Sequence, residues 1–325
     1  MNFKDFYPRT LADLVGKPRL KKRLRTHLIA SLKKSSPFPH TLLYGPPGLG
    51  KTAVPHAIAS EMKVGLKYVS APSLNKVGHL ISALVNLEEG DILLLDEIHR
   101  LPRAVEEVLY KVLDSSRVSV VIGSGVSGRV LDIDIAPFSL FGTTTLLHRV
   151  SSPLRSRFQI VERLDFYSEK EMLSMARRYA GLLSMDLKDE LLVLISNRAR
   201  GTPRNLINLL KNLHDFVIAN SWDFASLDSD RLNEFFENFG IYEYGLTSLD
   251  IEYIRTLYED FSKGPVGIET IATSLGEDPS TLESEVEPFL LRLGFIKRTR
   301  RGRVLTPSGE NFYKGFQFNT FQKRL

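Results

Sequence analysis

The sequence predicts an α/β domain built on a parallel sheet, followed by an all-helical domain and a C-terminal winged helix-turn-helix. Three observations lead to this prediction. From about 38 to 145, short apolar runs alternate with helical stretches, as they do in parallel α/β units. From about 168 the strand patterns stop, and from about 241 three helical segments precede two short strands. We expect domains at 1–167, 168–240 and 241–325.

The strands of the first domain follow from short apolar runs. The run at 92–95 is continuously apolar, which is typical of a strand buried on both faces of a parallel sheet. Residues 104–113 have a helical pattern between the strands. Residues 118–134 have two β-rich arms around a Gly/Ser centre, which predicts a β-hairpin. The predicted strands of the sheet are 41–44, 66–70, 92–95 and 138–142.

Helical periodicity accounts for most of the rest of the chain. Apolar residues recur at helical spacing in seven further segments, and short strands at 295–298 and 303–305 flank Arg301-Gly302. A small hairpin closing three helices is the layout of a winged helix. The predicted helices are 169–182, 188–199, 203–217 and 228–238 in the second domain, and 247–261, 267–275 and 279–293 in the third.

Composition excludes several classes of protein. The chain has 325 residues, 43% of them hydrophobic and 25% charged, which is ordinary for folded domains and unlike disordered or fibrous chains. There is no cysteine, so disulfides, zinc ribbons and cysteine nucleophiles are excluded. The N-terminal sequence lacks a signal-peptide core, and no stretch approaches the about 18 apolar residues of a membrane helix. We expect a cytoplasmic protein without a membrane partner.

Charge is distributed unevenly along the chain. The net charge is +5, yet residues 291–325 contain nine Lys and Arg and one acid, so the other 290 residues sum to −3. Residues 241–290 hold eleven acids and two bases. A cationic end of this kind predicts an anionic partner.

Residues 45–52 (GPPGLGKT) fit the phosphate-binding pattern G-x-x-x-x-G-K-[ST], between a predicted strand and a helical stretch. Glycines allow backbone N–H groups to close around phosphates. Lys51 would supply a charge to the β/γ oxygens, and the Thr52 hydroxyl would bind Mg²⁺. A chance match of a Gly/Pro-rich turn is the alternative.

Asp96 and Glu97 end the apolar strand that begins at Ile92. In P-loop enzymes the first acid after such a strand helps to hold Mg²⁺, and a second acid can activate the attacking water. We assign these roles to Asp96 and Glu97. The alternative is a solvated strand end.

Five ordered motifs give the chain a resemblance to AAA+ ATPases, and within them to the RuvB family. They are 45–52 (GPPGLGKT), 93–100 (LLLDEIHR), 142–145 (GTTT), 152–158 (SPLRSRF) and 200–204 (RGTPR). Residues 86–91, 105–110, 264–267 and 302–303 also match the family, so the resemblance runs from about 7 to 310.

The resemblance implies a function. Members of the family are helicase-type ATP hydrolases that use ATP and Mg²⁺ to drive branch migration of Holliday junctions during DNA recombination and repair. They act on double-stranded DNA as a homo-hexamer with a RuvA-like junction-binding protein, and a junction resolvase is a further expected partner. By this resemblance, residues 1–167 form the AAA+ core, 168–240 the lid and 241–325 the winged helix.

The resemblance also assigns residues to roles. Thr144 matches the sensor-1 polar group, with Thr145 as its alternative. Arg157 matches the arginine finger that acts in trans on a neighbouring subunit, with Arg155 less favoured, and Arg204 matches the sensor-2 arginine. The implied catalytic set is Glu97, Asp96, Lys51, Thr144 and Arg157; the ATP-binding set is Tyr7, Gly48, Gly50, Lys51, Thr52, Ala53, Tyr167 and Arg204; Mg²⁺ would be held by Thr52 and Asp96.

Four positions depart from the family pattern. Tyr7 stands where an arginine is usual, which puts an adenine-side contact in question. Pro55 lies in the first turns of the helix after the P-loop, where a missing N–H costs least, so we expect slight distortion rather than a broken site. Leu146 follows the threonines where the family has arginine, and Pro279 replaces a third arginine expected on DNA.

The predicted wing and hairpin supply the partner sites. Residues 297–303 contain five cations, which suits a duplex backbone read without sequence preference. The expected DNA-binding residues are Arg298 and Arg303, which match family positions, with Arg300 and Arg301. The resemblance places the junction-binding partner on the 118–134 hairpin, where Val120, Ile122 and Val130 supply either an apolar docking edge or internal packing.

Two other functions remain possible from the sequence. One is an AAA+ loader or initiator that uses ATP as a switch to place another protein on DNA. Glu97 and Arg157 favour turnover over a switch. The other is a winged-helix regulator with a degenerate nucleotide site, which Pro55 and Leu146 keep open.

Overall fold

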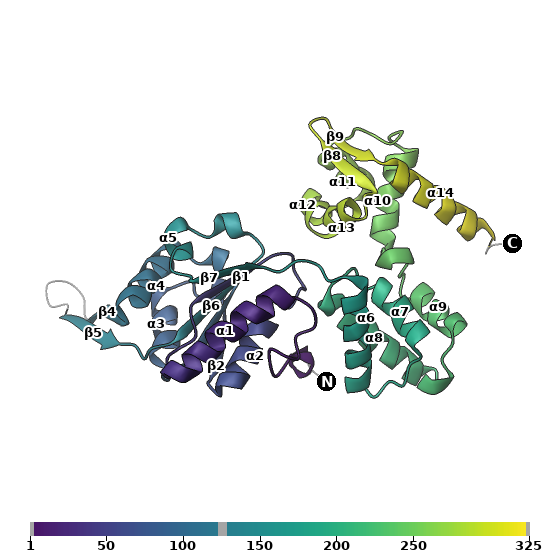
Figure 1. Cartoon of the computed structure of the whole chain (residues 1–325). Helices are drawn as coiled ribbons and strands as arrows, with labels where there is room; N and C mark the ends of the chain where they lie inside the picture. Colours follow the sequence, from purple (N-terminus) through teal and green to yellow (C-terminus); the bar gives the residue numbers. More distant parts are fainter. Residues whose placement is uncertain (1–2, 123–128, 323–325) are drawn as a thin grey trace. The chain divides into compact units, whose positions relative to one another are not determined.

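A computed structural model describes residues 3–122 and 129–322 of the chain (Figure 1). It divides into two compact units. One contains Met1–Ser184 and Gly201–Lys211, and the other contains Met185–Arg200 and Asn212–Leu325. Among the described residues, no helix combines the length and the apolar character that spanning a membrane requires.

The first unit is organised around a five-stranded parallel sheet with the strand order β2-β3-β6-β1-β7. The four strands expected from apolar runs are confirmed. The fifth, β7, has only two apolar residues before Glu162 and Arg163, so its pattern is too short to be recognised in the sequence. The strands are β1 (Thr41–Tyr44), β2 (Leu66–Ser70), β3 (Ile92–Asp96), β6 (Ser139–Thr144) and β7 (Ile160–Arg163).

Helices cover both faces of this sheet (Figure 1). Because strand side chains alternate, Leu43 and Leu94 pack toward α1 (Pro18–Lys34) and α2 (Ala53–Met62). Their neighbours Leu42 and Leu95 pack toward α3 (Val77–Val85) and α4 (Arg103–Ser115). The sheet is therefore buried on both sides, as its apolar strands require. The unit also contains α5 (Ser152–Arg155) and α6 (Glu169–Leu182).

The predicted hairpin is confirmed as β4 (Arg117–Ile122) paired antiparallel with β5 (Arg129–Asp134). Val118 is buried at its base. Residues 123–128 lie outside the described residues, and so do the side chains of Val120, Ile122 and Val130. The expectation that these three contact a partner stays a prediction.

The second unit contains the confirmed winged helix. The buried side chains of Tyr253, Leu290 and Leu305 belong to one core that joins its helices to the small sheet β8-β9. The elements that lie wholly in this unit are α7 (Asp189–Asn197), α9 (Ser229–Asn238), α10 (Ser248–Glu259), α11 (Ile268–Leu275), α12 (Pro279–Thr281), α13 (Glu287–Arg292), α14 (Pro307–Gln322), β8 (Ile296–Thr299) and β9 (Gly302–Leu305). Helix α8 (Pro203–Ala219) begins in the first unit and ends in the second.

The helical pattern predicted over 279–293 is confirmed, but the helix is not regular. The segment has a short α12, a π-helical turn over Leu282–Val286, and then α13. Pro288 supplies a physical reason, since proline has no N–H to donate and its ring crowds the carbonyl four residues earlier. A π-helical turn relieves such crowding, and it places Glu287 at the beginning of α13.

Candidate functional site

The phosphate-binding loop connects β1 to α2, as the motif predicts. Gly45 has φ 141°, and a Cβ there would lie 2.2 Å from the Leu164 carbonyl oxygen, so only glycine fits. Gly48 has φ 77° and its carbonyl accepts a hydrogen bond from the Arg204 N–H at 3.3 Å. The loop leads into the N-terminus of α2, where unpaired N–H groups favour an anion.

Lys51 is a buried cation in this loop. Its side-chain ammonium donates to the carbonyl oxygens of Gly45 and Pro46, each at 2.8 Å. Burial lowers the pKa of Lys51, while the nearby Glu97 and Asp96 carboxylates oppose that shift. The P-loop lysine and the two acids that end β3 therefore lie within electrostatic reach of one another.

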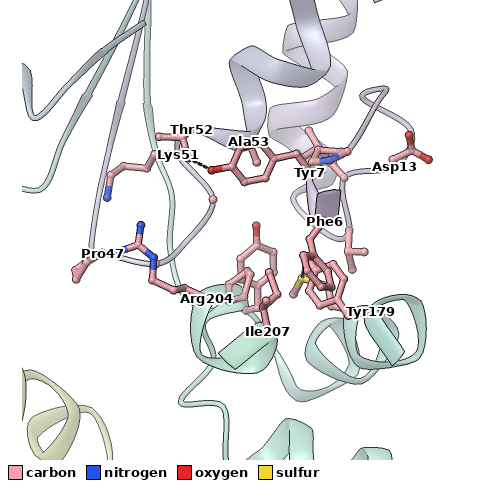
Figure 2. Close-up of a pocket in the computed structure, with 18 of the residues that line it drawn as sticks. Phe6, Tyr7, Asp13, Pro47, Lys51, Thr52, Ala53, Tyr179, Arg204 and Ile207 are labelled. Carbon is pink, nitrogen blue, oxygen red and sulfur yellow. Dashed lines mark hydrogen bonds between the residues drawn. The ribbon is translucent and has the colours of Figure 1, made fainter. Parts of the chain in front are cut away.

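Tyr7 contacts the other polar residue of the P-loop. Its hydroxyl and the Thr52 hydroxyl are hydrogen-bonded at 3.2 Å (Figure 2). The centre of its ring lies 4.7 Å from that of the His56 ring. The tyrosine thus lies beside the expected Mg²⁺ ligand. Pro55 occupies the third position of α2, where no intrahelical N–H bond is lost, and the helix continues to Met62.

Asp96 is held by hydroxyl groups from both neighbouring strands. Tyr68 on β2 donates to its Oδ2 at 2.9 Å, and Thr143 on β6 donates to its Oδ1. Burial raises the pKa of Tyr68 to about 12, and the hydrogen bond to Asp96 adds to the effect. These contacts fix the carboxylate at the carboxyl end of the sheet, where ligands of open α/β sheets bind.

Glu97 has a left-handed backbone conformation, with φ 54° and ψ 44°. This conformation is uncommon for a residue other than glycine. Its Oε2 accepts a hydrogen bond from the Thr145 hydroxyl at 3.3 Å and lies 3.2 Å from Nδ1 of His99. The Thr144 hydroxyl is bonded to the same Nδ1 at 2.9 Å. Thr145 therefore contacts Glu97 directly, whereas the fully buried Thr144 contacts it through His99.

The predicted nucleotide residues line one pocket of about 530 Å³ (Figure 2). Arg204, from the first turn of α8, extends into it beside the P-loop residues Pro47 and Lys51. The Tyr167 hydroxyl donates to the Leu49 carbonyl at 3.3 Å, which closes the pocket near the loop. Of the predicted residues, the lining contains Tyr7, Gly48, Gly50, Lys51, Thr52, Ala53, Asp96, Glu97, Tyr167 and Arg204.

Arg157 does not line this pocket. Its Nε donates to Asp114 at 2.9 Å, its Nη2 donates to the second oxygen of the same carboxylate, and its Nη1 donates to the Pro153 carbonyl at 2.7 Å. Its guanidinium also lies 5.0 Å from the centre of the Tyr110 ring. The arginine is thus held in a fixed orientation away from the pocket of its own chain, while Arg155 is exposed.

The wing places its arginines in two different environments. Arg300 and Arg301 are exposed at the hairpin turn. Arg298 and Arg303 are opposite one another on β8 and β9, and both donate to the buried carboxylate of Glu287. The five cations of the predicted wing are therefore not equivalent.

Sequence reasoning gave no role to several residues that contact the predicted ones, among them Tyr68, His99, Asp114 and Glu287. His99 lies two positions after Glu97 in the 93–100 motif, so this short separation in sequence could have indicated the contact. Tyr68 lies 28 positions from Asp96 and is brought there by parallel pairing of β2 with β3. Nothing in a single sequence indicates that register, or the contacts of Asp114 and Glu287 with arginines.

Family models match three consecutive segments of the chain. Residues 6–164 match the Holliday junction DNA helicase RuvB P-loop domain. Residues 167–231 match the RuvB AAA lid domain, and residues 243–314 match the RuvB C-terminal winged helix domain.

Individual relatives match over most of their length. The chain is 40% identical over 318 residues to the Holliday junction branch migration complex subunit RuvB of Thermotoga maritima, covering 98% of this chain and 94% of the relative. It is 42% identical over 301 residues to the subunit of the same name in Oleidesulfovibrio alaskensis, covering 92% of each. A solved structure titled Thermotoga maritima RuvB Holliday junction branch migration motor aligns with a TM-score of 0.82 and 38% identity, over 95% of this chain and 98% of that chain. These matches confirm the resemblance, and the chain belongs to the RuvB family of the AAA+ ATPases.

Proposed function

We propose that this chain hydrolyses ATP and uses the energy to move duplex DNA through Holliday junctions. The observation that carries the proposal is the convergence of Lys51, Glu97 and Arg204 on one pocket beside the N-terminus of α2. That combination of cations, a carboxylate and helix N–H groups suits a nucleoside triphosphate with its transferable phosphoryl group. Membership of the RuvB family supplies the DNA substrate.

The residues present fit a magnesium-bound nucleotide. Thr52 and Asp96 both line the pocket and offer hydroxyl and carboxylate oxygens, the ligands that Mg²⁺ prefers beside phosphates. When bound, the ion would neutralise phosphate charge. Lys51 from the P-loop and Arg204 from α8 would hold the phosphates together, and Tyr167 would flank the nucleotide.

Glu97 is the proposed general base for the attacking water. The Thr145 hydroxyl donates to its carboxylate, and His99 lies against the same oxygen, so two neighbours restrict the side chain. A base that is already oriented loses little entropy when the water binds. On this geometry Thr145 and Thr144 divide the sensor-1 role, the first by direct contact with Glu97 and the second through His99.

Tyr68 gives a test of the proposed Mg²⁺ site. We expect Tyr68→Phe to raise the Mg²⁺ concentration for half-maximal ATPase activity about threefold to tenfold, because Asp96 loses one of its two hydroxyl partners. The rate at saturating Mg²⁺ should change less. Tyr313→Phe removes a tyrosine–carboxylate bond from the winged helix and serves as the matched control. An unchanged Mg²⁺ requirement in Tyr68→Phe would contradict the role given to Asp96.

Arg157 implies that the working assembly is a ring. Because it is absent from the lining of its own pocket, its proposed place is the active site of a neighbouring copy. Asp114 and Tyr110 keep the guanidinium oriented for that contact. We infer a homo-hexamer, as is usual for the family.

DNA and protein partners complete the proposed machine. The wing would contact the duplex backbone through Arg298, Arg300, Arg301 and Arg303. Backbone contacts carry no sequence information, as a motor that moves along any DNA sequence requires. The β4-β5 hairpin is the proposed site for a RuvA-like junction-binding protein, and a junction resolvase is a further proposed partner.

An ATP-dependent loader is the second candidate, because it would share the fold and the pocket. A motor turns over ATP continuously on DNA, whereas a loader hydrolyses about once per loading event. Steady-state ATPase measurements with and without duplex DNA separate the two. We expect DNA to stimulate sustained turnover; a single burst followed by no further hydrolysis would favour the loader.

A further inference from the structure

Glu287 is a buried carboxylate at the point where the wing meets the helices. Its side chain has 0% exposure. One of its oxygens accepts hydrogen bonds from the Tyr253 hydroxyl at 2.7 Å and from Nε of Arg303 at 2.8 Å. The other accepts from Nε of Arg298 at 2.6 Å. A single carboxylate thus joins α10, β8 and β9.

The carboxylate is charged at neutral pH. Burial raises the pKa of Glu287, but the hydrogen bonds from Arg303, Tyr253 and Arg298 outweigh burial and hold the pKa below its usual value. Burying ions has a desolvation cost, and well-packed apolar side chains would often be as stable. The cluster therefore calls for a role other than stability alone.

The cluster restrains the two arginines to different degrees. Arg303 is 14% exposed, donates also to Glu283 at 2.6 Å, and its backbone pairs with Val266 in both directions. Arg298 is 46% exposed and contacts Glu287 through Nε and Nη2. The guanidinium of Arg298 is therefore anchored along one edge and remains accessible to solvent elsewhere.

The same cluster contributes no net positive charge. Two arginines are balanced by Glu283 and Glu287, whereas Arg300 and Arg301 are exposed beside them. If the wing attracted DNA by charge alone, the two acids would weaken it. Fixed donors have a different advantage, since an arginine that is already oriented loses less side-chain entropy when it meets a phosphate.

We propose that Glu287 is a positioning residue for duplex binding, which holds the guanidinium groups of Arg298 and Arg303 in the orientation that meets the DNA backbone. The proposal rests on the proposed function of the wing. It assigns the exposed Arg300 and Arg301 to charge attraction, and the Glu287 cluster to the geometry of the contact.

If charge attraction dominates, Glu287→Gln should bind duplex more tightly, because it removes one negative charge. If positioning dominates, it should bind more weakly, because it loosens the restraint on two arginines. Binding of the full-length protein to a fluorescent duplex should weaken about tenfold. The matched control is Glu285→Gln, which makes the same charge change at an exposed position of the preceding turn. It should bind as tightly as the wild type or more tightly.

Two further variants separate positioning from loss of stability. Tyr253→Phe removes one partner of Glu287 and leaves both arginine contacts, so it should lower the thermal unfolding midpoint while duplex affinity stays within about twofold. In an Arg298→Ala/Arg303→Ala background, Glu287→Gln should cause no further loss, since the residues act together. If Glu287→Gln does not fold at the assay temperature, Glu287→Asp, which keeps the charge on a shorter side chain, replaces it, with Glu285→Asp as its control.

The contradicting results are distinct. Glu287→Gln that binds duplex as tightly as Glu285→Gln would overturn the proposal. So would a loss of affinity that persists in full when both arginines are alanine, because a structural effect would then explain it. A wild-type chain that binds no duplex would instead overturn the proposed function of the wing.

Discussion

Glu97→Gln is expected to reduce the steady-state ATPase rate by about 10² to 10⁴-fold, the usual contribution of a positioned general base. Glutamine keeps the size of the side chain and can still accept from Thr145, so the pocket should keep its shape. ATP affinity should therefore remain within a few-fold of the wild type. The rate is measured by phosphate release, and affinity by binding of a fluorescent ATP analogue.

The control for this substitution is Glu107→Gln, which makes the same chemical change on the exposed face of α4. It should leave the rate unchanged, because Glu107 pairs only with the exposed Arg103 among the contacts described. An ATPase rate in Glu97→Gln close to that of the wild type would show that another group activates the water.

Arg157→Ala is expected to cause an equal or larger loss of hydrolysis, about 10³-fold or more, with ATP binding retained. The reason is the location of the side chain, which Asp114 holds away from the pocket of the same chain. Arg155→Ala removes the exposed neighbouring arginine and is the matched control, with little expected effect.

Mixing subunits tests whether Arg157 acts in trans. A Lys51→Ala subunit lacks the proposed phosphate-binding lysine but still offers Arg157, and an Arg157→Ala subunit has the converse defect. Rings that contain both should form some intact composite sites and recover part of the activity. Mixtures as inactive as either variant alone would exclude a finger that acts between subunits.

Much of the fold could be predicted because its signals are local. Strand β3 is an unbroken apolar run and was recognised, whereas β7 has only Ile160 and Val161 before charged residues and was not. The π-helical turn inside the predicted helix at 279–293 escaped prediction for a related reason. The spacing of apolar residues predicts a helix, but it does not reveal the π-helical turn that precedes Pro288.

The candidate site likewise contains residues that local motifs predict and residues that only the tertiary structure brings together. Lys51, Asp96 and Arg204 belong to contiguous motifs, and the structure places them around one pocket. Their partners are determined by tertiary structure. Tyr68 reaches Asp96 only because β2 and β3 pair in parallel register, and Glu287 reaches the wing only after a π-helical turn.

Arg298 illustrates a difference between arginines that the net charge of the segment does not reveal. Counting charges treats every arginine of the wing as an equal attraction for phosphate. In the structure Arg298 and Arg303 share a buried carboxylate, while Arg300 and Arg301 are exposed. The distinction depends on Glu287, which lies in a segment that the sequence marks as helical and acidic.

Branch migration of a synthetic four-way junction is the most direct test of the account. Labelled strands of a junction with homologous arms are followed in the presence of ATP, Mg²⁺ and a RuvA-like junction-binding protein. We predict strand exchange with the wild-type chain and none with Glu97→Gln or without ATP. Sustained ATP hydrolysis with no strand exchange, with or without the junction-binding protein, would contradict the claim that the chain is a branch migration motor.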